Sequence, residues 1–310
     1  MSKKNKALVL FSGGLDSILV VKILEKQGIK VKALSFKSYF FSVDQAEKSA
    51  EENDIDLMIV DFSKEHLDLV KNPKYGYGKE FNPCIDCHLL MLKKAKEVMK
   101  KNKFSFVATG EVLGQRPMSQ NKKALNLIKK ESSLNGYLLR PLSAKLLEET
   151  IPEKKGIIDR ESLFDFSGKQ RKSQMRLAKK LGIKKYPNPA GGCLLTDSEF
   201  GERLKDLFEN CFNCDGNDIK LLKYGRHFWR EKFLIIVGRD EKENKKIKKI
   251  AREKDVVVEM KEYPGPATLI RNYGSKGVSD AIIGVAKDLT QHYSTKARNE
   301  INVGFKLKNI

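Results

Sequence analysis

The sequence has 310 residues, which is enough for one large or two medium-sized domains with buried cores. Its 60 Lys and Arg against 40 Asp and Glu give a formal net charge of +20, which favours a polyanionic partner such as RNA or DNA. No apolar run approaches the roughly 20 residues that span a bilayer, so we expect a cytoplasmic protein with no membrane partner. Five cysteines in a reducing compartment indicate metal binding or catalysis before disulfides.

The first motif follows an apolar run at residues 8–11, which predicts a strand buried on both faces of a parallel sheet. The turn at residues 12–17 reads Ser-Gly-Gly-Leu-Asp-Ser and leads into an apolar-periodic helix. Glycines let the backbone approach a phosphate, and the helix N-terminus presents free N–H groups. Asp16 could hold a Mg²⁺ ion that bridges phosphates. An ordinary strand-to-helix turn with an N-capping serine is the alternative. We expect nucleotide phosphates to bind at Ser12, Gly13, Gly14, Asp16 and Ser17.

Strands and helices then alternate along the chain. Residues 30–36 and 55–61 read as strands with a helix at 44–53 between them, which indicates a doubly wound parallel α/β sheet. Ligands of such sheets bind at the carboxyl ends of the strands, where Ser35 and Phe36 fall and could form an adenine rim. A further strand is expected at residues 104–109.

Two Cys-x-x-Cys pairs raise the question of a metal site. Cys84, Cys87 and His88 match the attachment pattern of c-type haem, which requires export and is therefore rejected. A zinc site that joins the first pair to Cys211 and Cys214 would need a separation far beyond that of zinc ribbons. We expect His88 to be a helix N-terminal or packing residue.

A third arrangement joins Cys84 and Cys87 to Cys193, all expected on Pro/Gly-rich turns beside the α/β sheet. Three thiolates would hold three irons of a 4Fe–4S cluster and leave the fourth iron open to hydrosulfide. A catalytic thiol/disulfide relay is the second interpretation, and zinc is the third.

The turn at residues 12–17 resembles the PP-loop of the ATP pyrophosphatases, which cleave ATP between the α and β phosphates to adenylate a substrate. Residues 109–120, Thr-Gly-Glu-Val-Leu-Gly-Gln-Arg-Pro-Met-Ser-Gln, resemble a segment of the ThiI-type tRNA 4-thiouridine synthetases, and so does the Arg-Pro-Leu at 140–142. This resemblance implies that ATP activates a uridine oxygen and that sulfur replaces it. The residues expected to line that site are Gly110, Glu111, Gln115 and Gln120. Glu111 could equally be a helix-capping carboxylate.

The cysteines resemble those of iron–sulfur-dependent tRNA thiolases, which implies that Cys84, Cys87 and Cys193 act in catalysis as cluster ligands. We recognise neither a THUMP domain before the PP-loop nor a rhodanese domain after it. The resemblance therefore does not identify the sulfur donor, which could be a protein or free sulfide.

The last third of the chain has a different character. Strands are expected at residues 233–237, 256–260 and 267–270, and helices at 241–252 and 278–291, so this part reads as a smaller α+β domain. An ordered series of motifs, among them Gly238-Arg239 and Pro264-Gly-Pro266, resembles the NFACT-R RNA-binding domain. This resemblance implies RNA binding, and we expect Lys and Arg of both domains, Arg239 and Arg271 included, to contact tRNA phosphates.

These observations lead to one hypothesis and two alternatives. Residues 1–205 would form a PP-loop ATP pyrophosphatase domain, and residues 206–310 an RNA-binding domain. The function would be ATP-dependent tRNA thiolation of the 4-thiouridine type. The expected cofactors are ATP, Mg²⁺ and a 4Fe–4S cluster. The expected partner is tRNA, and the chain could form a homodimer. The alternatives are a non-catalytic tRNA- or ribosome-binding translation factor and a PP-loop ligase that inserts nitrogen.

Overall fold

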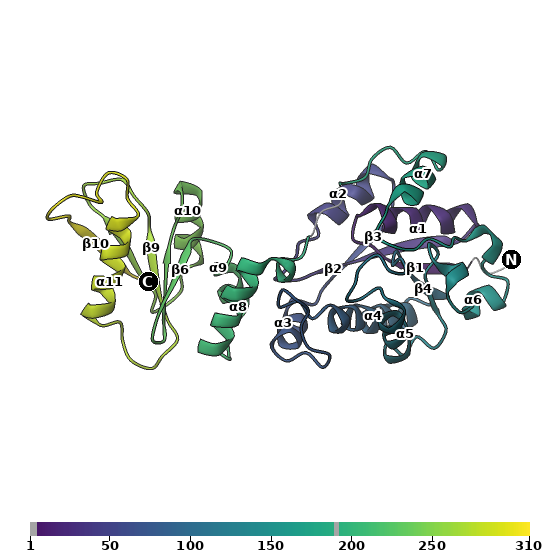
Figure 1. Cartoon of the computed structure of the whole chain (residues 1–310), viewed down its shortest axis with the longest axis horizontal. Helices are drawn as coiled ribbons and strands as arrows, with labels where there is room; N and C mark the ends of the chain where they lie inside the picture. The colour runs from purple at the N-terminus through teal and green to yellow at the C-terminus, as the bar shows by residue number, and fades with distance from the viewer. Residues whose placement is uncertain (1–4, 189–191) are drawn as a thin grey trace. The chain divides into compact units, whose positions relative to one another are not determined.

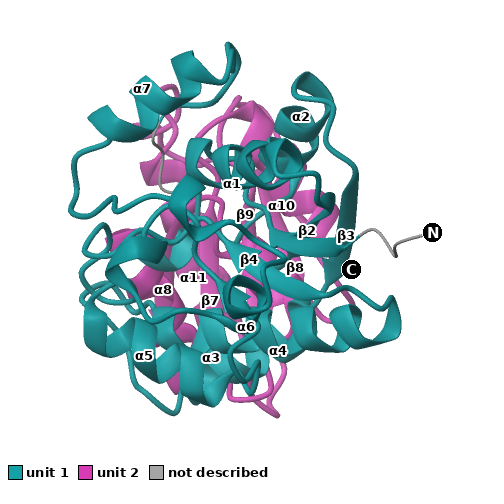
Figure 2. Ribbon diagram, turned by 90° about the vertical axis from the view of Figure 1, so that its right-hand side faces the viewer, with its two compact units in different colours: residues 1–196 teal, residues 197–310 magenta. Residues whose placement is uncertain are grey.

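The computed structural model describes residues 5–188 and 192–310 (Figure 1). The chain divides into two compact units, residues 1–196 and 197–310, which Figure 2 colours separately. The boundary expected after residue 205 falls inside helix α8 (Ser198–Asn210), which belongs to the second unit as a whole. The division between the units therefore precedes this helix.

The first unit is built on a five-stranded sheet with the order β3-β2-β1-β4-β5, in which every neighbouring pair is parallel. This arrangement confirms the predicted doubly wound α/β class. Its strands are β1 (Lys6–Leu10), β2 (Lys30–Lys37), β3 (Leu57–Asp61), β4 (Phe106–Thr109) and β5 (Leu138–Leu139).

Helices cover both faces of this sheet (Figure 1). Alternate residues of β1 point to opposite faces: Ala7 and Val9 join one buried cluster, and Leu8 joins another. The first cluster packs against α1 (Leu15–Lys26), α2 (Asp44–Glu52) and α7 (Lys172–Lys180). The second packs against α4 (Cys84–Lys101) and α5 (Lys122–Glu131), beside α3 (Ser63–Lys71), and a short α6 (Ile151–Lys154) follows β5.

The second unit carries an antiparallel sheet with the order β10-β8-β9-β7-β6, which confirms the predicted α+β class. Helix α11 (Asp280–His292) packs on β7, β8 and β9, and α10 (Glu241–Ile250) packs on β9 and α9 (Gly216–Leu221). The strands are β6 (Arg226–Arg230), β7 (Phe233–Val237), β8 (Val256–Met260), β9 (Thr268–Asn272) and β10 (Phe305–Asn309).

Within residues 5–188 and 192–310, no helix combines the length and the apolar composition that crossing a membrane would require.

Candidate nucleotide and sulfur site

The turn at residues 12–17 follows β1 and opens α1, as the sequence predicts. Gly14 is the N-cap of α1 in an extended conformation, with φ −78° and ψ 161°. Among the described residues, the backbone amides of Leu15 and Asp16 have no hydrogen-bond acceptor, so they are available to an anion. The buried Ser17 hydroxyl donates to the Gly14 carbonyl at 2.8 Å, and the Gly14 amide donates to Ser12 Oγ at 3.4 Å. Both serines therefore shape the turn.

At two positions of the predicted site the neighbouring backbone lies so close that only glycine fits. Gly13 has φ +77°, and a Cβ there would lie 2.5 Å from the Gln45 carbonyl oxygen at the start of α2. A Cβ on Gly110 would lie 2.9 Å from the Ser17 backbone nitrogen. The segment after β4 therefore packs directly against the first turn of α1, which brings the two motifs of the sequence together.

Asp16 is the acidic group of this turn. Its Oδ2 accepts a hydrogen bond from Gln115 Nε2 at 2.8 Å and lies 3.8 Å from an Arg171 guanidinium nitrogen. Its Oδ1 is buried and has no partner within the described part of the chain. A buried carboxylate oxygen without a donor fits Mg²⁺, which prefers oxygen ligands.

Helix α7 contributes two neighbours that sequence reasoning missed. Gln174 is buried, and its Nε2 donates to Gln115 Oε1 at 3.1 Å, so it supports the amide that holds Asp16. Arg171 is the residue that precedes α7. A basic helix on the outside of the sheet carries no local signal for such a role, because only the tertiary fold brings α7 beside α1.

Glu111 is buried after β4 and both of its carboxylate oxygens are hydrogen-bonded. His88 Nδ1 lies 2.8 Å from Oε1, while Thr109 Oγ1 and Arg140 Nε donate to Oε2 at 2.9 and 2.8 Å. Burial alone would raise its pKa, but Arg140 and His88 hold the pKa of Glu111 well below its usual range. Glu111 is therefore an ionised link between segments, and the helix-capping interpretation is wrong.

Three further predicted residues are buried in the first unit. Ser35 and Phe36 lie near the carboxyl end of β2 and are buried. Gln120 is also buried; its backbone carbonyl accepts from the Gly114 amide at 2.7 Å, while its Oε1 has no partner among the described residues.

The three cysteines of the predicted cluster differ from expectation in their placement. Cys84 and Cys87 lie in the first turn of α4, and the expectation that both sit on a turn is wrong because Pro83 is the N-cap of this helix. The Pro/Gly turn expected before Cys193 includes residues 189–191, which lie outside the described residues.

The structure brings the three thiols within electrostatic range of one another. Burial and the neighbouring Cys193 and Cys84 thiols raise the pKa of Cys87, and burial raises the pKa of Cys193 to about 11. Two of the sulfurs have nitrogen neighbours: Asn82 Nδ2 donates to Cys84 Sγ at 3.0 Å, and His66 Nε2 lies 2.9 Å from Cys87 Sγ. Such contacts fit the chemistry of ligated thiolates. In residues 5–188 and 192–310, however, no group of three or more His, Cys, Asp or Glu is placed so that it could hold a metal ion.

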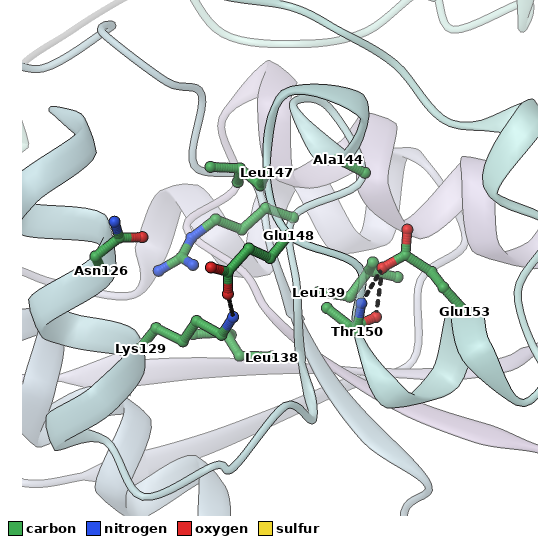
Figure 3. A pocket seen from close by; sticks show the side chains of 10 residues that line it. Asn126, Lys129, Leu138, Leu139, Ala144, Leu147, Glu148, Thr150 and Glu153 are labelled. Carbon is green, nitrogen blue, oxygen red and sulfur yellow. Dashed lines mark hydrogen bonds and ion pairs between the residues drawn. The ribbon is translucent and has the colours of Figure 1, made fainter.

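A small cavity near Arg140 is shown in Figure 3, where Lys129 reaches Glu148 and Thr150 donates to Glu153. Its volume of about 20 Å³ is room for about one water molecule and excludes a nucleotide. Its other lining residues are Asn126, Leu138, Leu139, Ala144 and Leu147.

The two arginines expected to contact RNA differ in their environments. Arg271 is fully buried in β9 and pairs with Asp218 and Asp255 at 2.9 and 2.7 Å, so the prediction of a phosphate contact is wrong for this residue. Arg239 is exposed, and its guanidinium pairs with Glu243 of α10.

Two family models match the chain. Residues 2–158 match the model of ThiI, described as thiamine biosynthesis protein, and residues 225–309 match the RNA-binding domain of NFACT proteins. The second match covers the antiparallel sheet of the second unit and confirms the resemblance drawn from its motifs.

Curated relatives cover overlapping parts of the chain. The tRNA-specific 2-thiouridylase MnmA of Caldicellulosiruptor saccharolyticus is 27% identical over 228 residues, which are 64% of this chain and 58% of that protein. A probable tRNA sulfurtransferase of Finegoldia magna is 30% identical over 155 residues, 49% of this chain and 39% of that protein. The chain thus spans less than two thirds of the length of these relatives.

Among solved structures, a 4-thiouridine synthetase–RNA complex with bound ATP is 19% identical, with a TM-score of 0.38 over 58% of this chain and 52% of that chain.

The ThiI model covers just over half of the 310 residues, from the first strand through the Glu111 and Arg140 segments. The chain therefore belongs to the ThiI family.

Proposed function

We propose that the protein is an ATP-dependent tRNA sulfurtransferase that performs thiolation of the 4-thiouridine type. A uracil carbonyl oxygen attacks the α phosphorus of ATP, and the bond to the pyrophosphate leaving group breaks. Sulfide then attacks the uracil carbon that bears the adenylated oxygen, and the carbon–oxygen bond breaks as AMP leaves. Activation is needed because the carbonyl oxygen by itself is a poor leaving group.

One observation carries this proposal: the segment after β4 contacts both the turn at residues 12–17, called the phosphate turn below, and helix α4, which carries Cys84 and Cys87. Gln115 donates to Asp16 at 2.8 Å, and Glu111 pairs with His88 at 2.8 Å. His88 follows Cys87 directly in α4. A single short loop thus contacts both the turn at residues 12–17 and the helix that carries Cys84 and Cys87, as a reaction that couples ATP cleavage to sulfur transfer requires.

The residues of the turn have separate roles in this proposal. The amides of Leu15 and Asp16 would bind phosphate oxygens, and Asp16 Oδ1 would hold Mg²⁺. Ser12, Gly13, Gly14 and Ser17 give the turn its shape, Ser35 and Phe36 would border the base, and Gln115 would orient Asp16. Gly110, Glu111 and Gln120 would line the place where nucleotide and uridine meet.

We further propose that Cys84, Cys87 and Cys193 hold a 4Fe–4S cluster. Such a cluster, with three cysteine ligands, would supply sulfide for the attack on the activated carbon. The proximity of the three thiols, the Asn82 amide that donates to Cys84 Sγ and the His66 nitrogen beside Cys87 Sγ support this assignment. A catalytic thiol relay is the alternative, and it uses the same three residues.

Binding of tRNA is assigned to the second unit, because its sheet matches an RNA-binding domain and because the chain carries a net charge of +20. Relatives named 2-thiouridylase and probable tRNA sulfurtransferase support a tRNA substrate. A tRNA substrate in turn implies a cytoplasmic protein. Two further points stay predictions: that a protein or free sulfide donates the sulfur, and that the chain can form a homodimer.

Nucleoside analysis of tRNA tests the activity. We expect mass spectrometry of tRNA from cells that lack the gene to show loss of one thiouridine, restored by the wild-type gene and not by Asp16→Asn. If every thionucleoside persists, the sulfurtransferase assignment fails, and a non-catalytic RNA-binding protein or a nitrogen ligase takes its place.

The cluster has its own test. Protein purified without oxygen should be brown and should contain iron and acid-labile sulfide, and Cys193→Ala should lose both. Colourless protein with stoichiometric zinc would contradict the cluster and leave the sulfurtransferase reaction open to a thiol-based carrier.

A further inference from the structure

His66 is fully buried on α3 and sits among aromatic rings. Its imidazole stacks on Phe62 with centroids 4.9 Å apart and planes inclined by 16°. Phe40 meets it edge-on at 5.4 Å, and Phe41 lies at 5.5 Å. Because the ring is held on several sides and excluded from water, each of its two nitrogens must find a partner inside the protein.

Both nitrogens have one. Nδ1 lies 2.7 Å from Ser38 Oγ, and Nε2 lies 2.9 Å from Cys87 Sγ. A neutral imidazole has one N–H donor and one acceptor, so two proton arrangements compete. Either Nε2–H points at the sulfur, or Nδ1–H points at Ser38 and Nε2 accepts the thiol proton.

Ser38 distinguishes the two arrangements. The Phe40 amide already donates to Ser38 Oγ at 3.2 Å, and the hydroxyl is buried at the end of β2. Within the described chain, His66 Nδ1 is the other partner of this oxygen. If Nδ1 carried the proton, the Ser38 oxygen would face two donors and its own hydrogen would have no acceptor. A buried unmet donor costs about 1–3 kcal/mol, so the hydroxyl is expected to donate to Nδ1.

We propose that Ser38 and His66 form a directional relay that fixes an Nε2–H donor on the sulfur of Cys87. The relay runs from the Phe40 amide through the Ser38 hydroxyl to Nδ1 of His66, and Nε2–H then meets the sulfur. This inference rests on the proposed sulfur chemistry for its purpose, but its geometry does not depend on that chemistry.

The relay gives His66 a role that differs from that of a general base. A base that deprotonates a thiol needs a free lone pair on the nitrogen that faces sulfur, whereas here that nitrogen carries the hydrogen. An N–H donor stabilises sulfur in its anionic form, whether the sulfur is a metal ligand or a carrier of transferable sulfur. His66 and Ser38 are therefore positioning residues for Cys87.

The segment around Ser38 also contacts the residue that follows the third cysteine. The Leu194 amide donates to the Phe40 carbonyl at 3.0 Å, one residue after Cys193. The same turn after β2 thus orients the donor to Cys87 and anchors the chain beside Cys193.

Nitrogen NMR of the full-length protein, uniformly ¹⁵N-labelled, reduced and metal-free, tests the proton arrangement directly. The sequence has 4 His, so His66→Phe assigns the ring signals. We expect His66 to carry hydrogen on Nε2 and none on Nδ1 near neutral pH, and Ser38→Ala to populate the other tautomer. A wild-type ring protonated on Nδ1, or on both nitrogens, would overturn the proposal. This result stands whether or not the protein thiolates tRNA.

Activity provides the second readout. His66→Phe keeps an aromatic ring against Phe62 but removes the donor, and His66→Gln restores an N–H group. We expect His66→Phe to lower the rate of thiouridine formation about 10–100-fold while ATP-dependent pyrophosphate release stays within about twofold, with partial rescue in His66→Gln. Ser38→Ala, which keeps the ring, serves if His66→Phe unfolds. Equal rates in the wild type and Ser38→Ala would contradict the relay.

Discussion

Gln115 Nε2 donates a hydrogen bond to Asp16 Oδ2 at 2.8 Å and so joins two motifs that lie 99 residues apart in the chain. The same Gln115 accepts from Gln174 at 3.1 Å, so the Asp16 carboxylate is oriented by a chain of two amides. The other Asp16 oxygen, Oδ1, has no hydrogen-bond partner among the described residues. The phosphate turn is thus preorganised by residues far from it in the sequence.

Asp16 is the residue on which ATP cleavage should depend most. Asp16→Asn keeps the size of the side chain and removes the charge that would hold Mg²⁺. We expect pyrophosphate release to fall at least about hundredfold without loss of fold. The matched control is Asp56→Asn, an exposed carboxylate paired with Lys32 ahead of β3, which should leave the rate unchanged. Equal rates in both variants would exclude Asp16 from catalysis.

Gln115→Ala removes the donor to Asp16 and leaves the charge in place. A hydrogen bond to a charged group contributes about 1.5–3 kcal/mol, so kcat/KM for ATP should fall about tenfold or more. Steady-state pyrophosphate kinetics measures this change. Gln27→Ala, at the opposite end of α1 beside Asp159, is the control and should behave as wild type. A Gln115 variant with unchanged kinetics would refute the orienting role.

Glu111→Gln breaks a buried ion pair and leaves Arg140 without its counter-charge. Removal of one partner of such a pair costs about 3–5 kcal/mol, which urea unfolding should detect as a lower free energy of unfolding. The control is Glu148→Gln, whose solvent-exposed pair with Lys129 should contribute little to the free energy of unfolding. Similar losses in the two variants would mean that the Glu111 network adds nothing beyond a surface pair.

Several elements could be predicted from the sequence because their apolar periodicity is local. The strands at residues 233–237 and 256–260 coincide with β7 and β8. Strand β6 was missed because Arg-His-Phe-Trp-Arg is rich in charge and is stabilised by its pairing with β7 along the sheet edge.

In the site, too, residues that lie in short motifs could be predicted, whereas residues that only the fold brings together could not. The phosphate turn and the Glu111 segment were recognisable, since both carry their residues in short motifs. Gln174 and His66 could not be assigned, because only the fold brings them to Gln115 and Cys87. Arg271 was misassigned for the same reason, since Asp218 and Asp255 reach it from other parts of the chain.

Arg271→Met leaves the buried Asp255 without its cation and the buried Asp218 with Arg252 alone. We expect the second unit to lose about 3–5 kcal/mol of its free energy of unfolding, measured by denaturant titration. Arg230→Met, an exposed change on β6, should cost little by comparison. If Arg271→Met folds stably and instead reduces the salt dependence of RNA binding, Arg271 is a phosphate contact after all.

Acid should weaken the second unit through Glu243. Hydrogen bonding to Arg239 lowers the pKa of Glu243 to about 2, from 4.5 in the unfolded chain. Since the folded state binds the proton less readily, this stabilisation is full above about pH 4.5 and is lost as the pH falls towards 2. Glu243→Gln should therefore be less stable than the wild type by about 1 kcal/mol at pH 7 and equal to it near pH 2. A difference that does not change with pH would contradict the ion pair.

Reconstitution with isotopically labelled sulfide tests the central claim most directly. The complete protein, ATP, Mg²⁺, sulfide and an unmodified tRNA transcript are incubated without oxygen, and the digested tRNA is analysed by mass spectrometry. The account predicts one labelled thiouridine per tRNA, formed together with one AMP and one pyrophosphate, and none of these with Asp16→Asn. AMP and pyrophosphate without label in the tRNA, or labelled tRNA without ATP, would contradict it.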